Sequence, residues 1–398
     1  MRRRLLLSLA VAIAAPAAAA AQVMPDAPFG WATCSSLTGG DGYVLTGGDS
    51  GRTVILRSNG EDMREDIRKS LKDYDVIVFD GSKGDFLVSA TIVLDQLAGK
   101  TLLGINGARL RTVFQVSPDL RKALDDARVK EISTGSRGGV LSNGARVTEE
   151  RETRTRQITL DFLGDPQERY RQSGIFQLKR CENFIIRNLA FQGPGPIDAG
   201  ADDLLTLSNA SSHIWVDHCS FTDGMDGNFD INSRADFITV SWCVFQYTDR
   251  AYDHCLSNLI GSSDNPSDGV DQLNVTFAYC VWGNGCQGRM PMVRFGNIHL
   301  LNNCYNCPGA RSVVNPRTGS EVLVEGCYFA KGVKKAFTAK DARGYAFRGN
   351  IFMEEFNPVD DGTVDPFPYR YTPVPAARVP RLTRKSGPTL KPAVPGLR

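Results

Sequence analysis

The segments IWVDHCSF (residues 214–221) and ITVSWCVF (residues 238–245) decide the fold, because the second repeats the pattern of the first. In each segment a cysteine stands two places before a final phenylalanine. Short runs rich in Val, Ile and aromatic residues are typical of β-strands. A strand that returns at a regular interval with the same ending indicates a solenoid, since each coil buries its apolar face only against its neighbours.

Five further segments extend this repeat in both directions. They are IIRNLAF ending at Phe191, NVTFAYCVW ending at Trp282, IHLLNNCYN ending at Asn306, VLVEGCYF ending at Phe329 and YAFRGNIF ending at Phe352. The seven ends are separated by 30, 24, 37, 24, 23 and 23 residues, so the basic interval is 23 to 24 residues. The short strands, separated by Gly, Asn and Asp, predict an all-β fold of the parallel β-helix type rather than a helical repeat.

Half of the ten cysteines follow the repeat. Two places before the segment ends stand Cys219, Cys243, Cys280, Cys304 and Cys327, with Asn350 in the next coil. Strands of neighbouring coils lie about 4.8 Å apart, so we expect these side chains to stack as an interior ladder of small groups. Cys286 and Cys307 lie off this column, and we expect a disulfide between them because exported chains commonly form such bridges.

Residues 1–21 have the layout of a secretory signal peptide, with three arginines, the apolar run LLLSLAVAIAAP and an Ala-rich end. The apolar run is shorter than the ~20 residues that a membrane span needs. We therefore expect a secreted protein, extracellular or periplasmic, with no membrane association. Without this segment the chain has 43 basic and 44 acidic residues, a balance that does not favour nucleic acid.

The remaining chain divides into a solenoid, an insertion and a tail. We expect one β-helix domain over residues 22–355, opened by a capping helix at residues 61–74, where Met63, Ile67 and Leu71 have helical spacing. A charged, partly helical insertion at about residues 116–172 interrupts the repeat, either as a wall of a binding site or as a solvated excursion. Residues 356–398 are Pro-rich and should run extended along the solenoid or be partly loose.

Carboxylates gather where the repeat is lengthened. Asp203 and Asp226 are 23 residues apart, one basic coil, and Asp230 follows in the same segment, TDGMDGNFDI. Clustered carboxylates repel one another unless a cation lies among them, and hard oxygen ligands suit Ca²⁺. The alternative is that these Asp-Gly pairs only form turns. Asp202 is the alternative to Asp203 as the third ligand.

Together with LIGSSD, RMPMVRFG and NNCYN, the segment WVDHCSFTDGMDGNFDI resembles polysaccharide lyase family 1, the pectate lyases, and the resemblance covers most of residues 30–355. It implies a right-handed single-stranded parallel β-helix that cleaves polygalacturonate by Ca²⁺-dependent β-elimination. The expected partner is therefore an acidic polysaccharide, polygalacturonate or pectin, and we expect the protein to be a monomer.

The resemblance also implies roles for individual residues. Asp226 and Asp230 match the family's calcium-binding Asp-Gly-x-x-Asp, and Asp203 best matches the third ligand. Arg289 matches the arginine that removes the substrate proton, and Arg294 matches the arginine that holds the substrate carboxylate. A bidentate guanidinium suits a uronate carboxylate, and Pro291 stiffens the turn between the two arginines.

One position departs from the family pattern. Family members often carry a lysine in an Asp-His-x-Lys segment, where this chain has Leu256. Arg250, Arg234, Arg154 or Arg156 could supply the missing cation, or the site could prefer a less charged polymer. Two alternatives therefore stay open: a pectin lyase acting on methyl-esterified pectin, and a non-catalytic glycan-binding β-helix.

Overall fold

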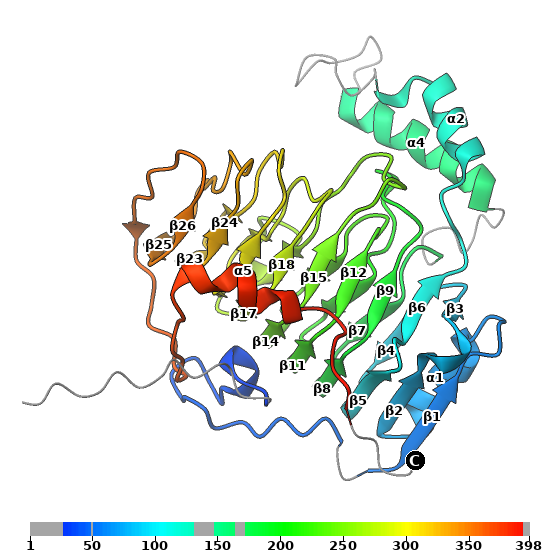
Figure 1. Ribbon diagram of the computed structural model, residues 1–398, viewed down its shortest axis with the longest axis horizontal. Coiled ribbons are helices and arrows are strands. Elements are labelled where there is room, and N and C mark those ends of the chain that lie inside the picture. The colour runs from blue at the N-terminus through cyan, green and yellow to red at the C-terminus, as the bar shows by residue number, and fades with distance from the viewer. Residues whose placement is uncertain (1–26, 49–50, 131–146, 164–171, 393–398) are drawn as a thin grey trace, which may run out of the picture.

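The computed structural model describes residues 27–48, 51–130, 147–163 and 172–392, and the chain winds into a parallel β-helix (Figure 1). Successive coils add strands to three sheets, in which every pairing is parallel except the one at the C-terminal end of the first sheet. The fold class predicted from the repeat is confirmed. The predicted signal segment, residues 1–21, lies outside the described residues.

The three sheets are formed by the three strands of successive coils. The first sheet contains, in order, β1 (Thr53–Arg57), β2 (Val76–Asp80), β5 (Ala98–Ile105), β8 (Glu182–Arg187), β11 (Ser212–Asp217), β14 (Asp236–Ser241), β17 (Val275–Ala278), β20 (Asn297–Leu301), β23 (Glu321–Glu325), β25 (Gly344–Arg348) and β27 (Asp361–Gly362). The second contains β3 (Phe86–Val88), β6 (Arg109–Thr112), β9 (Ala190–Gln192), β12 (Ser220–Thr222), β15 (Val244–Gln246), β18 (Val281–Trp282), β21 (Cys304–Tyr305), β24 (Tyr328–Phe329) and β26 (Ile351–Phe352). The third contains β4 (Ile92–Asp95), β7 (Phe176–Lys179), β10 (Leu205–Ser208), β13 (Phe229–Ile231), β16 (Leu259–Ile260), β19 (Met292–Val293) and β22 (Asn315–Pro316).

An aromatic stack runs through the interior of the second sheet. Its members are Phe191, Phe221, Phe245, Trp282, Tyr305, Phe329 and Phe352, whose successive ring centroids lie 4.4 to 5.3 Å apart. Six of these rings were predicted as segment ends, but the seventh was placed at Asn306. That prediction is wrong by one residue, because Tyr305 carries the ring that continues the stack between Trp282 and Phe329.

The same shift corrects the cysteine column. Strand pairing sets Cys304 beside Val281 and Tyr328, so the column contains Asn303 in place of Cys304. Cys304 instead belongs to an apolar cluster with Tyr279, Leu301 and residues of the C-terminal segment. The column therefore runs Cys219, Cys243, Cys280, Asn303, Cys327 and Asn350.

The column side chains are hydrogen-bond donors as well as small packing groups. The Cys280 thiol donates to the Val240 carbonyl (3.5 Å), and the Asn303 amide donates to the Phe277 carbonyl (2.9 Å), the equivalent group one coil later. The Oδ1 atom of Asn303 also accepts from the Cys280 backbone N–H at 2.8 Å. Each column residue thus binds the backbone of the preceding coil.

None of the ten cysteines, all within the described residues, forms a disulfide. The expected Cys286–Cys307 bridge is therefore wrong. Both side chains are buried, and the Cys286 thiol donates to the Phe245 carbonyl at 3.4 Å. Burial raises the pKa of the Cys307 thiol to about 12 and that of Cys286 well above its ordinary value, so neither thiolate is favoured.

Helices cover the solenoid at several places. Helix α1 (Arg64–Asp73) buries Ile67 and Leu71 against the first coils and is the predicted cap. Helices α2 (Pro118–Asp126) and α4 (Val147–Leu163) lie within the expected insertion and project beyond the coils (Figure 1). The short C-terminal helix α5 (Val379–Leu382) lies along the flank of the solenoid. Of the helices described, none is long and apolar enough to cross a bilayer.

Within the part of the chain that the structure describes there are also five 3₁₀-helices: η1 (Gly30–Thr33), η2 (Gly81–Lys83), η3 (Pro266–Asp268), η4 (Ala376–Arg378) and η5 (Thr383–Lys385). The first of them ties the N-terminal segment to the first sheet. Backbone N–H groups of Trp31 and Ala32 donate to the hydroxyls of Thr276 and Thr239, which lie on neighbouring strands.

We predict that Asn303→Ala lowers the free energy of unfolding by about 2–3 kcal/mol, because the Cys280 N–H and the Phe277 carbonyl lose buried partners. Asn303→Cys keeps a donor in the column and should lose less. Urea unfolding followed by circular dichroism measures both values. Equal losses in the two variants would show that a thiol donor at this position contributes nothing to stability.

Candidate active site

The three candidate carboxylates lie in two successive coils, where the chain leads from the second sheet to the third. The loop between β9 and β10 carries Asp203, the loop between β12 and β13 carries Asp226, and β13 itself carries Asp230. Because Leu205 pairs with Phe229, the register brings Asp203 beside Gly227. The structure therefore places the three predicted carboxylates next to one another in adjacent coils.

Gly227 leaves a space among oxygen atoms. A Cβ at this residue would lie 2.6 Å from Asp203 Oδ1, 3.4 Å from Asp230 Oδ1 and 3.4 Å from the Leu256 carbonyl oxygen. Asp203 Oδ1 is buried and has no hydrogen-bond partner, whereas Asp203 Oδ2 accepts from the Thr206 hydroxyl at 3.1 Å. An unpartnered buried carboxylate oxygen facing an oxygen-lined space is suited to a cation.

Burial and mutual repulsion dominate the electrostatics of the three carboxylates. Desolvation, followed by the charges of Asp230 and Asp226, raises the pKa of Asp203 well above its ordinary value. Desolvation raises the pKa of Asp230 to about 7, although Arg289 opposes the change. Desolvation also raises the pKa of Asp226, against the opposing charges of His254 and Arg289. Perturbed carboxylates of this kind concentrate at functional sites.

The donor set fits a hard divalent cation, although the side chains do not form a closed cage. Across the described residues, no group of three or more His, Cys, Asp or Glu side chains is arranged to hold a metal ion. Asp230 Oδ1 accepts from the Leu259 N–H at 2.9 Å, and Asp226 Oδ1 lies 3.5 Å from His254 Nε2.

Asp202, the alternative third ligand, has a different environment. Its Oδ2 accepts from the Thr91 hydroxyl at 2.6 Å, and its backbone N–H donates to the Ser173 hydroxyl at 2.9 Å. Asp202 is therefore bound to earlier parts of the chain, and the geometry favours Asp203 at the cluster.

Arg289 lies beside the carboxylates on the loop before β19. Its backbone has a φ of 55°, and its carbonyl accepts from the Asn258 N–H at 2.7 Å. Its charge acts on both Asp226 and Asp230. Within the described residues its guanidinium forms no hydrogen bond or ion pair, so it is available to a ligand.

Arg294 is held by partners other than the three carboxylates. It follows β19, and its side chain pairs with Asp264 (Nε–Oδ1, 2.9 Å) and donates to the Gly261 carbonyl at 3.1 Å. Asp264 also accepts from the Thr318 hydroxyl at 2.7 Å. The sequence segment LIGSSD contains Asp264, but nothing in the sequence spacing signalled that it would orient Arg294.

The cations suggested as substitutes at Leu256 are occupied elsewhere or face away. Arg250 pairs with the fully buried Asp223 (2.6 Å), and Arg234 donates to Gln272 at 3.0 Å. Arg156 donates to the Ala199 carbonyl, and Arg154 is exposed on α4. Another cation, Arg151 of α4, pairs with Asp198 and with Asp253, which lies three residues before Leu256.

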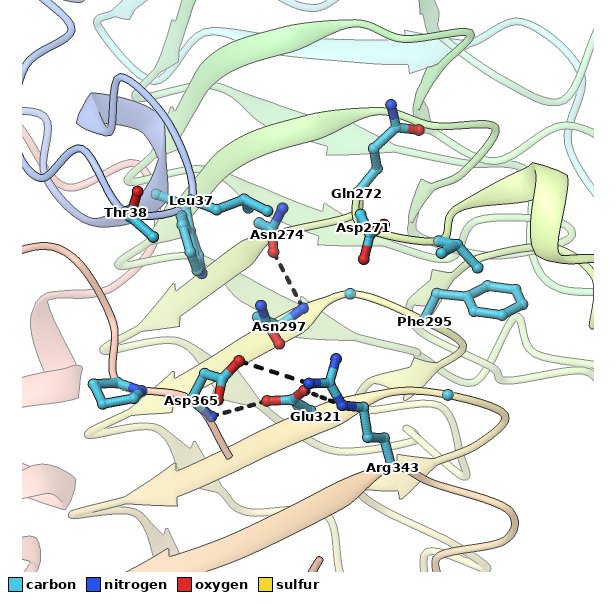
Figure 2. Close-up of a pocket in the computed structure, with 15 residues that line it drawn as sticks. Leu37, Thr38, Asp271, Gln272, Asn274, Phe295, Asn297, Glu321, Arg343 and Asp365 are labelled. Carbon is cyan, nitrogen blue, oxygen red and sulfur yellow. Dashed lines mark hydrogen bonds and ion pairs between the residues drawn. The ribbon is translucent and has the colours of Figure 1, made fainter. Parts of the chain in front are cut away.

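A separate cavity of about 650 Å³ lies at another corner of the solenoid, where the third sheet leads to the first (Figure 2). Asp271, Glu321 and Asp365 line it with one cation, Arg343. Arg343 Nε lies 2.8 Å from Glu321 Oε1, and the Asp365 N–H donates to Glu321 Oε2 at 2.9 Å. The excess of negative charge makes this cavity unsuited to a polyuronate.

Comparisons with known proteins agree with the fold. A family model described as "Pectate lyase" matches residues 167–358. The pectate lyase plyB of Emericella nidulans is 33% identical over 212 residues, which cover 50% of this chain and 61% of the relative. A pectate trisaccharide-lyase of Thermotoga maritima is 40% identical over 136 residues, covering 32% of this chain and 35% of the relative.

Solved structures match over more of the chain but at low identity. A pectate lyase from Bacillus sp. N165, solved in complex with trigalacturonate, superposes with a TM-score of 0.57 and 17% identity over 91% of this chain and 98% of that one. The cedar pollen allergen jun a 1 superposes with a TM-score of 0.58 and 16% identity over 91% and 93%. These structures share the fold. The family match and the relatives show that the chain is similar to the pectate lyases.

We predict that the metal-free protein loses stability as the pH rises from about 4 to about 7, because the folded state binds protons at Asp203 and Asp230 more tightly than the unfolded state. Asp230→Asn should flatten this dependence, whereas Asp66→Asn on the exposed face of α1 should not. Urea unfolding in chelator at several pH values measures the slope. An unchanged slope in Asp230→Asn would contradict the assigned cause.

Proposed function

We propose that this protein is a secreted pectate lyase that cleaves α-1,4-linked polygalacturonate by calcium-dependent β-elimination. The observation that carries the proposal is the cluster of Asp203, Asp226 and Asp230 with the unpartnered guanidinium of Arg289 beside it. The chain spans about three fifths of the length of the fungal relatives, and their names indicate the same activity.

Arg289 serves as the base in this proposal. It removes the proton at C5 of a galacturonate residue, the electron pair forms the C4–C5 double bond, and the bond from C4 to the glycosidic oxygen breaks. The leaving oxygen takes up a proton, so the products are a saturated end and an unsaturated uronate. A base of this kind contributes about 10²- to 10⁴-fold to the rate.

Arg289 must be neutral to accept the proton. In the absence of metal, the charge of Arg289 lowers the pKa of Asp226 and of Asp230, so the guanidinium and the two carboxylates attract one another. A cation held by Asp203, Asp226 and Asp230 would cancel this attraction. When bound, Ca²⁺ would supply a positive charge that stabilises the negative charge developing on the substrate carboxylate.

Arg294 binds a substrate carboxylate in this proposal. Asp264 and the Gly261 carbonyl take up Nε and one terminal nitrogen, so its orientation is set before substrate arrives. A pre-oriented guanidinium loses less conformational entropy on binding than a mobile one.

The substrate class, the partner and the location belong to the same proposal. The basic side chain beside clustered carboxylates suits an anionic uronate polymer that binds through a cation, and nothing in the overall charge favours nucleic acid. The signal-like layout of residues 1–21 supports export, and we propose that the protein acts as a monomer.

Arg289→Ala should lower kcat on polygalacturonate by about 10²- to 10⁴-fold, since the reaction loses its base. The appearance of the unsaturated product, followed by ultraviolet absorbance, measures the rate with calcium and with chelator. Arg68→Ala, which removes an exposed arginine of α1, is the matched control and should leave the rate unchanged.

Methyl-esterified pectin tests the alternative in the same assay. Leu256, which is neutral where relatives in the family often carry lysine, is the one feature that favours this substrate. Turnover of methylated pectin in chelator, with none of polygalacturonate, would contradict the proposal. A folded protein that binds polygalacturonate without turnover would instead indicate a glycan-binding β-helix.

Arg294→Ala should raise KM for polygalacturonate about tenfold or more, because a charged hydrogen bond to the substrate is lost. Asp264→Ala should raise KM less, since the guanidinium remains but is no longer oriented. Initial rates over a range of polymer concentrations give both values. A lower kcat at unchanged KM in Arg294→Ala would mean that Arg294 acts on the transition state alone.

A further inference from the structure

Helix α4 reaches the candidate active site through Arg151. The helix lies outside residues 167–358, which the family model matches, so the match does not account for it. The Arg151 side chain is 16% exposed, and its Nη1 lies 2.7 Å from Asp198 Oδ2. Its Nη2 pairs with Asp253 Oδ2, so one guanidinium joins carboxylates from two different loops.

The two carboxylates lie on loops next to the cluster. Asp198 belongs to the loop between β9 and β10, which also carries Asp203, and Asp253 belongs to the loop between β15 and β16. The Asp198 N–H donates to Asp253 Oδ1 at 3.0 Å, so the loops are in direct contact. Without Arg151, these two carboxylates would lose the cation that they share, and the contact between the loops would be weaker.

The contacts continue from Asp198 to Asp226. Asp198 Oδ1 lies 3.4 Å from His254 Nδ1, and His254 Nε2 lies 3.5 Å from Asp226 Oδ1. The imidazole is therefore placed between the carboxylate held by Arg151 and a proposed calcium ligand. Outer groups that orient ligand side chains commonly change metal affinity by about 10- to 100-fold when they are removed.

The insertion also packs against the loop that carries Asp226. Met225, which precedes Asp226, is buried in an apolar cluster with Leu120 and Leu124 of α2 and with Ile197. The Ile197 N–H donates to the Met225 carbonyl at 3.2 Å. Helices α2 and α4 thus contact the ligand-bearing loop by packing and by an ion-pair network.

We infer that Arg151 is a positioning residue for Asp226, acting through Asp198 and His254, and that the helical insertion is therefore a working part of the calcium site. The inference rests on the proposed function, because it concerns the metal that Asp203, Asp226 and Asp230 would hold. Arg151 contacts neither metal nor substrate in this arrangement. Its effect is on how firmly Asp226 is oriented.

Calorimetric titration of the chelator-treated protein with Ca²⁺ tests the inference without turnover. Arg151→Met should weaken calcium binding about tenfold. Arg121→Met is the matched control, because Arg121 of α2 joins the insertion to the same β15–β16 loop, at the Asp249 carbonyl (3.0 Å), without contacting Asp198 or Asp253. Its calcium affinity should equal that of the wild type.

A double-mutant cycle separates positioning from general destabilisation. Asp198→Asn should also weaken calcium binding. The double variant should bind calcium no more weakly than either single variant, since the two substitutions break the same network. At saturating calcium, the kcat of Arg151→Met should return to the wild-type value. A variant with a distorted fold would keep a low kcat. Arg151→Lys keeps the charge but not the geometry that binds two carboxylates, so its calcium affinity should be intermediate. It replaces Arg151→Met in the test if that variant fails to fold.

The outcomes separate the positioning role of Arg151 from the proposed function on which it rests. Wild-type affinity in Arg151→Met, or an equal loss in Arg121→Met, would overturn the positioning role and leave the proposed lyase intact. A wild-type protein that binds no calcium would overturn the proposed function, and the inference with it.

Discussion

The parallel pairing of successive coils is the constraint on which the rest of the structure depends. Every residue of a coil has a defined neighbour in the coils on either side, as in the pairing of Phe221 with Phe191 and Phe245. Interior positions therefore form columns of aromatic rings and of small hydrogen-bond donors, and outer positions form columns of functional groups. The site follows from the same rule, since Asp203 and Gly227 are neighbours only because Leu205 pairs with Phe229.

The carboxylate cluster is costly to the folded protein without a cation. Asp203 and Asp230 are buried, and their like charges repel one another. A fold selected for stability alone would replace such a group with apolar side chains, because buried ionic groups are seldom stabilising by themselves. The insertion adds a further largely buried network around Arg151, next to the same loops. The proposed calcium ion would account for both features, because it would have to be held in one geometry.

Much of the fold and part of the site could be predicted from the sequence, because the repeat is strong and has a physical cause. The aromatic ends of the segments and the spacing of Asp203 and Asp226 identified the columns and the cluster. The adjacent residues Asn303, Cys304 and Tyr305 were misassigned by one place, because cysteine and asparagine both fill the column and only the ring stack decides between them. The links from Arg151 and Asp264 could not be predicted, since neither follows the period of the solenoid.

The most direct test of the account is a crystal structure of Arg289→Lys grown with calcium and a short oligogalacturonate, with anomalous scattering used to locate the metal. The account predicts a calcium ion bound by Asp203, Asp226 and Asp230 beside Gly227, with a sugar carboxylate on the metal and another on Arg294. A metal bound elsewhere, or an oligosaccharide seated away from Arg294, would contradict it.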